Sequence, residues 1–187
     1  MALNAEQLKA MGIRQRGDPI LRRVATPFDL GAEAADATRL RARLGEYLHA
    51  LQQRYPFSKG IGLAAPQIGE GRAMALIRPA GDHLLALVNP EVTWRSEEKD
   101  ERVEGCLSFF DVRCPVVRAL AIRVRVTTLD GRSETVELDR AVARLALHEI
   151  DHLRGILCSD HLAPGRREIP VAEYRQGDTA WRYQDRC

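Results

Sequence analysis

The chain contains the pattern His148-Glu149-Ile150-Asp151-His152, in which two histidines stand four residues apart. Residues at this spacing lie on one face of a helix, so both imidazoles can bind the same metal ion. Glu149 then lies where its carboxylate can take a proton from an attacking water molecule. The pattern indicates a metal-dependent hydrolase, although two ordinary histidines on a solvated helix would give the same five residues.

A catalytic metal site of this kind uses a third protein ligand and keeps one position open. Cys158 would complete a longer helical pattern, but that class of site needs a methionine downstream, and none is present. Glu173 lies in a segment broken by proline and glycine, and His161 is expected at the surface after the helix. Cys106 follows Gly105, whose small size allows a close approach of the backbone. The residues favour Cys106 and leave the other three as alternatives.

The two histidines lie in a helix predicted over residues 139–153 from the spacing of its apolar residues. Asp139 is suited to cap the start of this helix, and Gly155 is suited to stop it. A second helix is predicted over residues 34–54 for the same reason, and Pro56 ends it.

Four short segments predict β-strands that pair with their neighbours along the chain. The first two are apolar runs separated by turn residues 79–82, and the other two flank Asp130-Gly131 as a hairpin. These strands are expected at residues 73–77, 84–88, 121–129 and 133–138.

Glycine and proline interrupt the pattern elsewhere. Residues 60–69 are rich in glycine but apolar, and they are predicted to form a structured loop packed against the core. Residues 17–27 are predicted to be irregular. Residues 163–187 are polar and broken, with a short helix near Tyr174.

The composition is that of an ordinary globular protein. Of 187 residues, 45% are hydrophobic and 29% are charged, which suffices for one core. We expect a single domain over residues 1–187, with a catalytic core at about 13–162 and a short extension at 163–187. The net charge of +2 predicts no membrane binding and no specific nucleic-acid binding. The first residues lack a leader pattern and no apolar run could span a membrane, so a cytoplasmic location is expected.

Three separated segments resemble the signature motifs of the peptide deformylase family, in that family's order and spacing. They are Gly60-Ile61-Gly62-Leu63-Ala64-Ala65-Pro66-Gln67, Glu104-Gly105-Cys106-Leu107-Ser108, and the HExxH pattern at 148–152 followed by Gly155. The similarity also touches residues 17–21. It implies an α+β fold in which antiparallel β-sheets pack around a central HExxH helix.

The resemblance implies that Cys106, His148 and His152 bind one divalent metal ion. In this family the ion is Fe²⁺, and Zn²⁺, Ni²⁺ or Co²⁺ can replace it with varying activity. No other cofactor is implied.

The resemblance also implies catalytic and substrate-binding positions. Glu149 would be the general base and acid, and Gln67 with the backbone N–H of Leu107 would form the oxyanion hole. The implied substrate-binding residues are Ile61, Gly62, Phe109, Phe110 and Asp111.

Further side chains near these motifs are expected to have structural roles. The resemblance implies that Asp151 pairs with Arg118. Ser108 is expected to form a hydrogen bond within its own loop. Cys114 and Cys158 are expected to be apolar filler, because the four cysteines show no disulfide pattern.

The implied reaction removes the N-formyl group from the formyl-methionine of newly made polypeptides and releases formate, with transient contact to the ribosome. Two departures from the family pattern favour an alternative. Leu147 replaces a glutamine, and Phe109-Phe110-Asp111 replaces an apolar residue and proline followed by glycine or glutamate. The alternative is a sibling amidohydrolase acting on another N-formyl or N-acyl compound in specialised metabolism. A non-catalytic metal-stabilised module is disfavoured, because it would need neither Glu149 nor Gln67.

Overall fold

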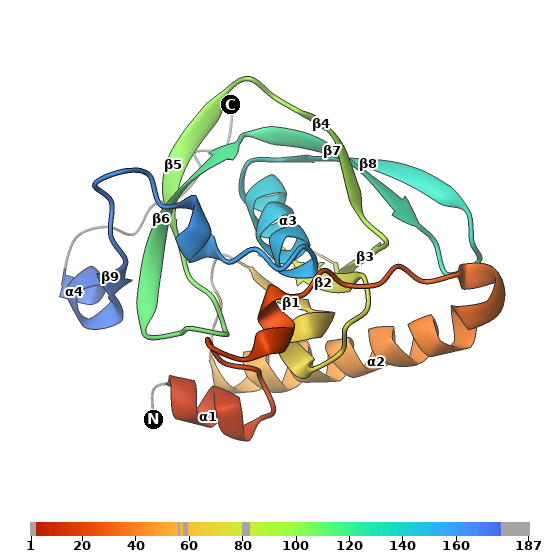
Figure 1. Cartoon of the computed structure of the whole chain (residues 1–187), viewed down its shortest axis with the longest axis horizontal. Helices are drawn as coiled ribbons and strands as arrows, with labels where there is room; N and C mark the ends of the chain where they lie inside the picture. The colour runs from red at the N-terminus through yellow and green to blue at the C-terminus, as the bar shows by residue number, and fades with distance from the viewer. Residues whose placement is uncertain (1–2, 56, 58–59, 80–82, 177–187) are drawn as a thin grey trace.

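Antiparallel sheets pack around one helix in the computed structural model, which describes residues 3–55, 57, 60–79 and 83–176 (Figure 1). That helix is α3 (Arg140–Leu153), which carries both histidines. It contacts strands from each of the three small sheets in the described part of the chain. Figure 1 shows α3 in the middle of the view, with the long helix α2 (Leu30–Arg54) below it. The predicted α+β class with antiparallel sheets is confirmed.

One sheet consists of β1 (Ile61–Ala64), β2 (Met74–Arg78) and β3 (Leu85–Val88). The strands predicted at 73–77 and 84–88 are confirmed as an antiparallel pair, and residues 80–82 of their turn lie outside the described residues. The loop prediction for 60–69 is wrong, because β1 pairs with β2 and a 3-10 helix follows at Ala65–Ile68. All four residues of β1 are buried, so its sequence lacks the apolar-polar alternation that reveals a strand.

The other two sheets are also antiparallel. The second contains β4 (Glu91–Arg95), β7 (Ala121–Thr127) and β8 (Ser133–Asp139), and the third contains β5 (Lys99–Glu104), β6 (Val112–Ala119) and β9 (Ile169–Pro170). The predicted hairpin around Asp130-Gly131 is confirmed as β7 and β8. Strands β5 and β6 form a second hairpin, and Cys106 lies in its connecting loop.

The segment after α3 packs back onto the third sheet. After a 3-10 helix at Cys158–His161, β9 pairs with the start of β6, and α4 (Val171–Gln176) confirms the short helix predicted near Tyr174. Residues 177–187 lie outside the described residues. The boundary between core and extension stays a prediction.

Helix α2 begins four residues before its predicted start, because the side chain of Asp29 accepts a hydrogen bond from the N–H of Gly31 and caps the helix. A stripe of buried leucines on α2 belongs to the same core cluster as residues of the first sheet. The stripe consists of Leu40, Leu44, Leu48 and Leu51. Pro56, the predicted stop, lies outside the described residues.

The N-terminal residues form two short helices, α1 (Ala5–Ala10) and a 3-10 helix at Pro19–Arg22. The latter lies within the segment 17–27 that was expected to be irregular. None of the helices in the described part of the chain combines the length and apolar character that crossing a membrane requires.

Both ends of α3 follow the prediction in position. Asp139 is the N-cap residue, although its side chain makes no capping hydrogen bond. Gly155 has a φ of +70°, a conformation that glycine adopts without strain. A Cβ at this position would lie 2.6 Å from the carbonyl oxygen of Arg22. Gly155 therefore ends the helix and also allows the N-terminal segment to touch it.

Buried charges attach α3 to the third sheet. Arg118 on β6 donates a hydrogen bond to Asp151 on α3, as the resemblance implies. The His161 ring also contacts Asp151, with Nε2 and Oδ2 2.8 Å apart. Burial opposes the ionised carboxylate, but the hydrogen bonds and charges of His161 and Arg118 outweigh it and lower the pKa of Asp151 below its ordinary 3.8. The ionised form of Asp151 therefore stabilises the docking of the helix.

We predict that Gly155→Ala lowers the free energy of unfolding by about 1 to 3 kcal/mol, because it adds a steric clash to backbone strain. Gly131→Ala is the matched control, since Gly131 has a φ of +83° but no atom within 4 Å of an added Cβ. Urea unfolding followed by circular dichroism measures both. Equal losses for the two variants would mean that the contact with Arg22 has no energetic effect.

We predict that Asp151→Asn costs about 3 kcal/mol of stability at neutral pH, because it breaks a buried ion pair. The lowered pKa of Asp151 means that its stabilising effect is present above the unfolded pKa, about 3.9, and is lost as pH falls through the folded pKa. The difference between variant and wild type should therefore narrow in acid. Urea unfolding at a series of pH values measures this, with exposed Asp130→Asn as the control. A difference in unfolding free energy that widens in acid would contradict the lowered pKa of Asp151.

Candidate metal centre

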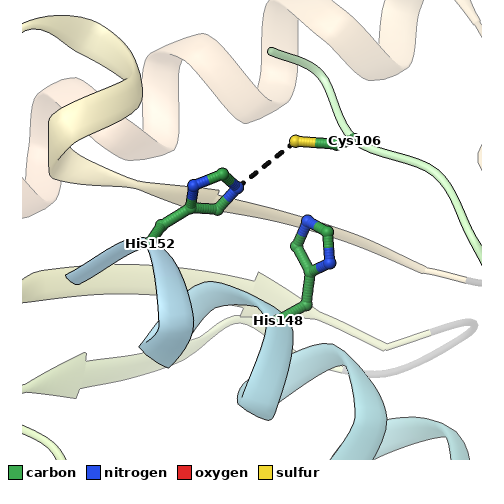
Figure 2. A group of neighbouring side chains, drawn as sticks. All are labelled: Cys106, His148 and His152. Carbon is green, nitrogen blue, oxygen red and sulfur yellow. Dashed lines mark hydrogen bonds between the residues drawn. The ribbon is translucent and has the colours of Figure 1, made fainter. Parts of the chain in front are cut away.

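Three potential ligands converge from two elements. His148 and His152 come from successive turns of α3, and Cys106 comes from the loop between β5 and β6. Figure 2 shows the thiol and both imidazoles gathered in one place, with Cys106 Sγ 3.3 Å from Nε2 of His152. All three residues are buried, and one ligand atom from each lies within 4.8 Å of the others. Among the described residues this is the one such group of three.

The spacing of these atoms fits a tetrahedral metal ion. Bonds of about 2.3 Å to sulfur and about 2.1 Å to nitrogen, at a tetrahedral angle, separate the two ligand atoms by about 3.6 Å. The observed distance between Cys106 and His152 is close to this value. Sulfur and imidazole donors suit Fe²⁺, Co²⁺, Ni²⁺ and Zn²⁺ rather than Mg²⁺ or Ca²⁺. The residues therefore fit a single transition-metal ion.

The other candidate third ligands have different partners. Cys158 packs beside Cys114 in an apolar cluster, where a thiol hydrogen bond lowers the pKa of Cys114 and raises the pKa of Cys158. His161 contacts Asp151, and Glu173 forms an exposed ion pair with Arg167. None of the three belongs to the group of converging ligand atoms.

Protonation differs between the two histidines. Burial and the nearby charge of His148 lower the pKa of His152 to about 3, which favours the neutral imidazole that binds metals. Burial also opposes charge on His148, but hydrogen bonds to Cys106 and Glu104 raise its pKa well above 6.5. The pKa values of the two histidines therefore shift in opposite directions because His148 has hydrogen-bond partners that outweigh the effect of burial.

A carboxylate that was assigned no role from the sequence orients His148. Oε2 of Glu104 lies 3.0 Å from Nδ1 of His148, which leaves Nε2 of that ring for a metal. Burial would raise the pKa of Glu104, but hydrogen bonds and charges from His148 and Arg118 lower it well below its usual range. Glu104 lies two residues before Cys106 and is the first residue of the motif at 104–108, and this position is the signal that the sequence offered.

A buried arginine on α3 also escaped the sequence analysis. Arg144 NH1 donates to Glu104 Oε1 at 2.8 Å, and NH2 donates to Asp100 Oδ1 at 2.7 Å. Arg144 stands four residues before His148, so both side chains lie on the same face of the helix. A charged residue on the buried face of a helix is the sequence signal that could have identified it.

Glu149 is buried against Gly62. An added Cβ on Gly62 would lie 2.3 Å from Oε1 of Glu149, so only glycine leaves room for this carboxylate. The other oxygen, Oε2, is buried and has no hydrogen-bond partner among the described residues. Burial is the main cause that raises the pKa of Glu149 to about 7. A carboxyl group with this pKa can exchange a proton near neutral pH.

Gln67 is held with its amide nitrogen toward Cys106. Its Oε1 accepts a hydrogen bond from the N–H of Ala64 at 2.9 Å, and its Nε2 donates to Ser108 Oγ at 3.2 Å. The nitrogen also lies 3.8 Å from Cys106 Sγ. Leu107, between Cys106 and Ser108, is buried. The Ser108 hydroxyl was expected to bond within its own loop, but it accepts this hydrogen bond from Gln67 and so helps to orient the amide.

The expected substrate-binding residues differ in exposure. Ile61, Phe109 and Phe110 are buried, whereas Asp111 is exposed. Phe110 lies in the same apolar cluster as Ile61, and Arg16 lies 5.4 Å above the ring of Phe109. Substrate binding by these residues stays a prediction.

Leu147, which departs from the family pattern, is buried in the cluster formed by α3 and strands of all three sheets. Its side chain therefore packs in the core.

The arrangement combines three potential metal ligands, a buried carboxyl group and an oriented amide. These are the groups needed for attack of water on a carbonyl carbon: a place for a Lewis acid, a proton acceptor and a donor for developing negative charge.

Comparison with known sequences supports this chemistry. The family model described as Polypeptide deformylase matches residues 10–168. The peptide deformylase of Bartonella tribocorum is 34% identical over 165 residues, covering 85% of this chain and 88% of its own. That of Thermotoga neapolitana is 34% identical over 155 residues, covering 83% and 88%.

Solved structures agree with the sequences. The crystal structure of peptide deformylase from Thermotoga maritima is similar, with a TM-score of 0.69 and 32% identity, covering 81% of this chain and 97% of that one. A probable peptide deformylase from Synechococcus phage S-SSM7 has a TM-score of 0.69 and 35% identity, covering 80% and 98%. With three converging ligands and matches along most of its length, the chain belongs to the peptide deformylase family of metal-dependent hydrolases.

Proposed function

We propose that this enzyme hydrolyses the N-formyl group of formyl-methionyl N-termini on newly made polypeptides and releases formate. The observation that carries the proposal is the buried Glu149 beside Cys106, His148 and His152, with one carboxylate oxygen free of partners among the described residues. The proposed setting is the cytoplasm, where the enzyme meets nascent chains in transient contact with the ribosome.

We assign the metal to Cys106, His148 and His152, with Fe²⁺ as the native ion and Zn²⁺, Ni²⁺ or Co²⁺ as substitutes. When bound, the ion would polarise the formyl carbonyl and increase the acidity of water. The convergence of one ligand atom from each of the three buried side chains supports this ligand set.

Glu149 moves the protons in this proposal. As the water oxygen attacks the formyl carbon, the Glu149 carboxylate accepts the water proton. When the C–N bond breaks, the same carboxyl group returns the proton to the leaving amine. These steps give formic acid and a free N-terminal amine. The acid then loses its proton to the amine or to solvent and leaves as formate, so atoms and charges balance.

Gln67 and the backbone N–H of Leu107 are proposed to donate to the oxygen that becomes negative during attack. The hydrogen bonds of Gln67 to Ala64 and Ser108 support this role, because they fix the direction of its N–H groups before substrate binds.

The substrate is proposed to lie along β1 at Ile61 and Gly62 and to approach the loop of Phe109, Phe110 and Asp111. The exposed Asp111 carboxylate would attract basic residues downstream of the formyl-methionine, within the limits that salt screening sets.

The purified enzyme should release formate from a formyl-methionyl peptide faster than from a panel of other N-formyl and N-acyl compounds. Formate release and kcat/KM for each compound measure this. The panel includes matched peptides with a basic or an acidic residue after formyl-methionine. Preference for a small non-peptide compound would replace the proposal with the sibling amidohydrolase.

Glu149→Gln should retain the metal and lose roughly 10² to 10⁴-fold in kcat, because an amide cannot accept the proton. Gly62→Ala should also lower kcat, since its Cβ would displace the Glu149 carboxylate. Elemental analysis and steady-state kinetics measure the two properties. A Gln variant within tenfold of wild type would exclude Glu149 as the base.

Cys106→Ala should abolish stoichiometric metal binding, whereas Cys158→Ala should retain it, because only Cys106 lies within the group of converging ligand atoms. The two cysteines form a matched pair, since both are buried. Elemental analysis after gel filtration measures the metal content. Loss of metal from the Cys158 variant alone would show that the wrong cysteine was chosen.

A further inference from the structure

The carboxylate of Glu104 is shared by donors from two elements. Arg118 on β6 donates to both oxygens, with Nε to Oε1 and NH2 to Oε2 each 3.0 Å apart. Arg144 on α3 adds a hydrogen bond to Oε1 at 2.8 Å. Oε2, which already accepts from Arg118, also contacts Nδ1 of His148 at 3.0 Å. The orientation of His148 therefore depends on where this carboxylate is held.

Arg144 is anchored at both ends of its guanidinium group. NH1 also donates to the carbonyl oxygen of Val116 at 2.9 Å, and NH2 donates to the carbonyl oxygen of Asp100 at 3.0 Å and to its carboxylate. The Arg144 side chain is only 5% exposed. Arg144 therefore joins α3 to both strands of the β5–β6 hairpin, close to Glu104.

We propose that Arg144 is a positioning residue for the metal ligand His148, acting through the carboxylate of Glu104. The inference rests on the metal site proposed above. Arg118 fixes Glu104 relative to β6, whereas Arg144 fixes it relative to the helix that carries His148. The contacts from Arg144 to Glu104 and from Glu104 to His148 begin and end on α3, so the ring and its hydrogen-bond partner move together.

Stability alone does not account for a buried arginine at this position. Removing a guanidinium from water is strongly unfavourable, and apolar residues of similar size often give equal or greater stability. What an apolar residue lacks is the fixed fork of N–H donors that orients a carboxylate. An arginine that holds the carboxylate partner of a metal-binding histidine is useful in this way, because the carboxylate fixes the direction of the ring nitrogen.

The test compares Arg144→Met and Arg144→Lys with the wild type and with Arg123→Met. Arg123 is the control because it forms an exposed ion pair with Glu137 on the second sheet. The dissociation constant of Zn²⁺ is measured by competition with a chelator, and the absorption spectrum of the Co²⁺ form reports the ligand geometry. Circular dichroism confirms that each variant is folded.

We expect Arg144→Met to weaken Zn²⁺ binding roughly tenfold or more, the range for partners behind a ligand, and to change the Co²⁺ spectrum. Arg144→Lys should also weaken binding, because lysine keeps the charge but lacks the fork. Arg123→Met should match the wild type. In a Glu104→Gln background the effect of Arg144→Met should be smaller, because its target carboxylate is gone.

Unchanged or tighter Zn²⁺ binding by folded Arg144→Met would overturn the inference. Tighter binding would mean that Arg144 acts on the ion only through the repulsion of its positive charge. If the Met variant does not fold, Arg144→Lys decides, and wild-type affinity and spectrum in that variant would overturn the inference. An equal loss in the Glu104→Gln background would exclude action through Glu104. Failure of the wild type to bind Zn²⁺ would instead overturn the metal site, and the inference with it.

Discussion

The carboxylate of Glu104 connects the strand leading to Cys106, the neighbouring strand β6 and the helix that carries His148. A buried carboxylate is unfavourable unless its oxygens are hydrogen bonded, so its burial requires Arg118, Arg144 and His148 to converge on it. Cys106 follows Glu104 by two residues. The constraint that satisfies one buried charge therefore also brings the thiol to the face of α3 that bears the histidines.

Burial has different effects on neighbouring residues of α3. It raises the pKa of Glu149 to about 7 and contributes most to lowering the pKa of His152 to about 3, and both shifts disfavour the charged form. His148 is equally enclosed, but its contacts with Glu104 and Cys106 reverse the direction. Within five residues of one helix, burial therefore sets the shifts of Glu149 and His152, whereas partners from another element set the shift of His148. Gly62 contributes by leaving the space that Glu149 occupies.

Sequence patterns predicted the elements that have one apolar and one polar face. The β7–β8 hairpin and α3 have such faces, and both were predicted within one or two residues. Strand β1 was predicted as a loop because burial on every side removed the alternation. Strands β5 and β6 were not predicted at all. Their pairing, rather than local propensity, stabilises the loop that holds Cys106.

The sequence by itself determined the chemistry that is available: two histidines at helical spacing, an acid between them, and cysteine, glutamine and glycine in separate motifs. Helical spacing is a local property, so it needs no knowledge of the rest of the chain. Tertiary structure decided which of four candidate ligands lies beside the histidines, because Cys106 and His152 are 46 residues apart and meet only through packing. The same holds for Glu104, Arg144 and the opposition of Gly62 to Glu149, since strand register and the docking of α3 bring these groups together.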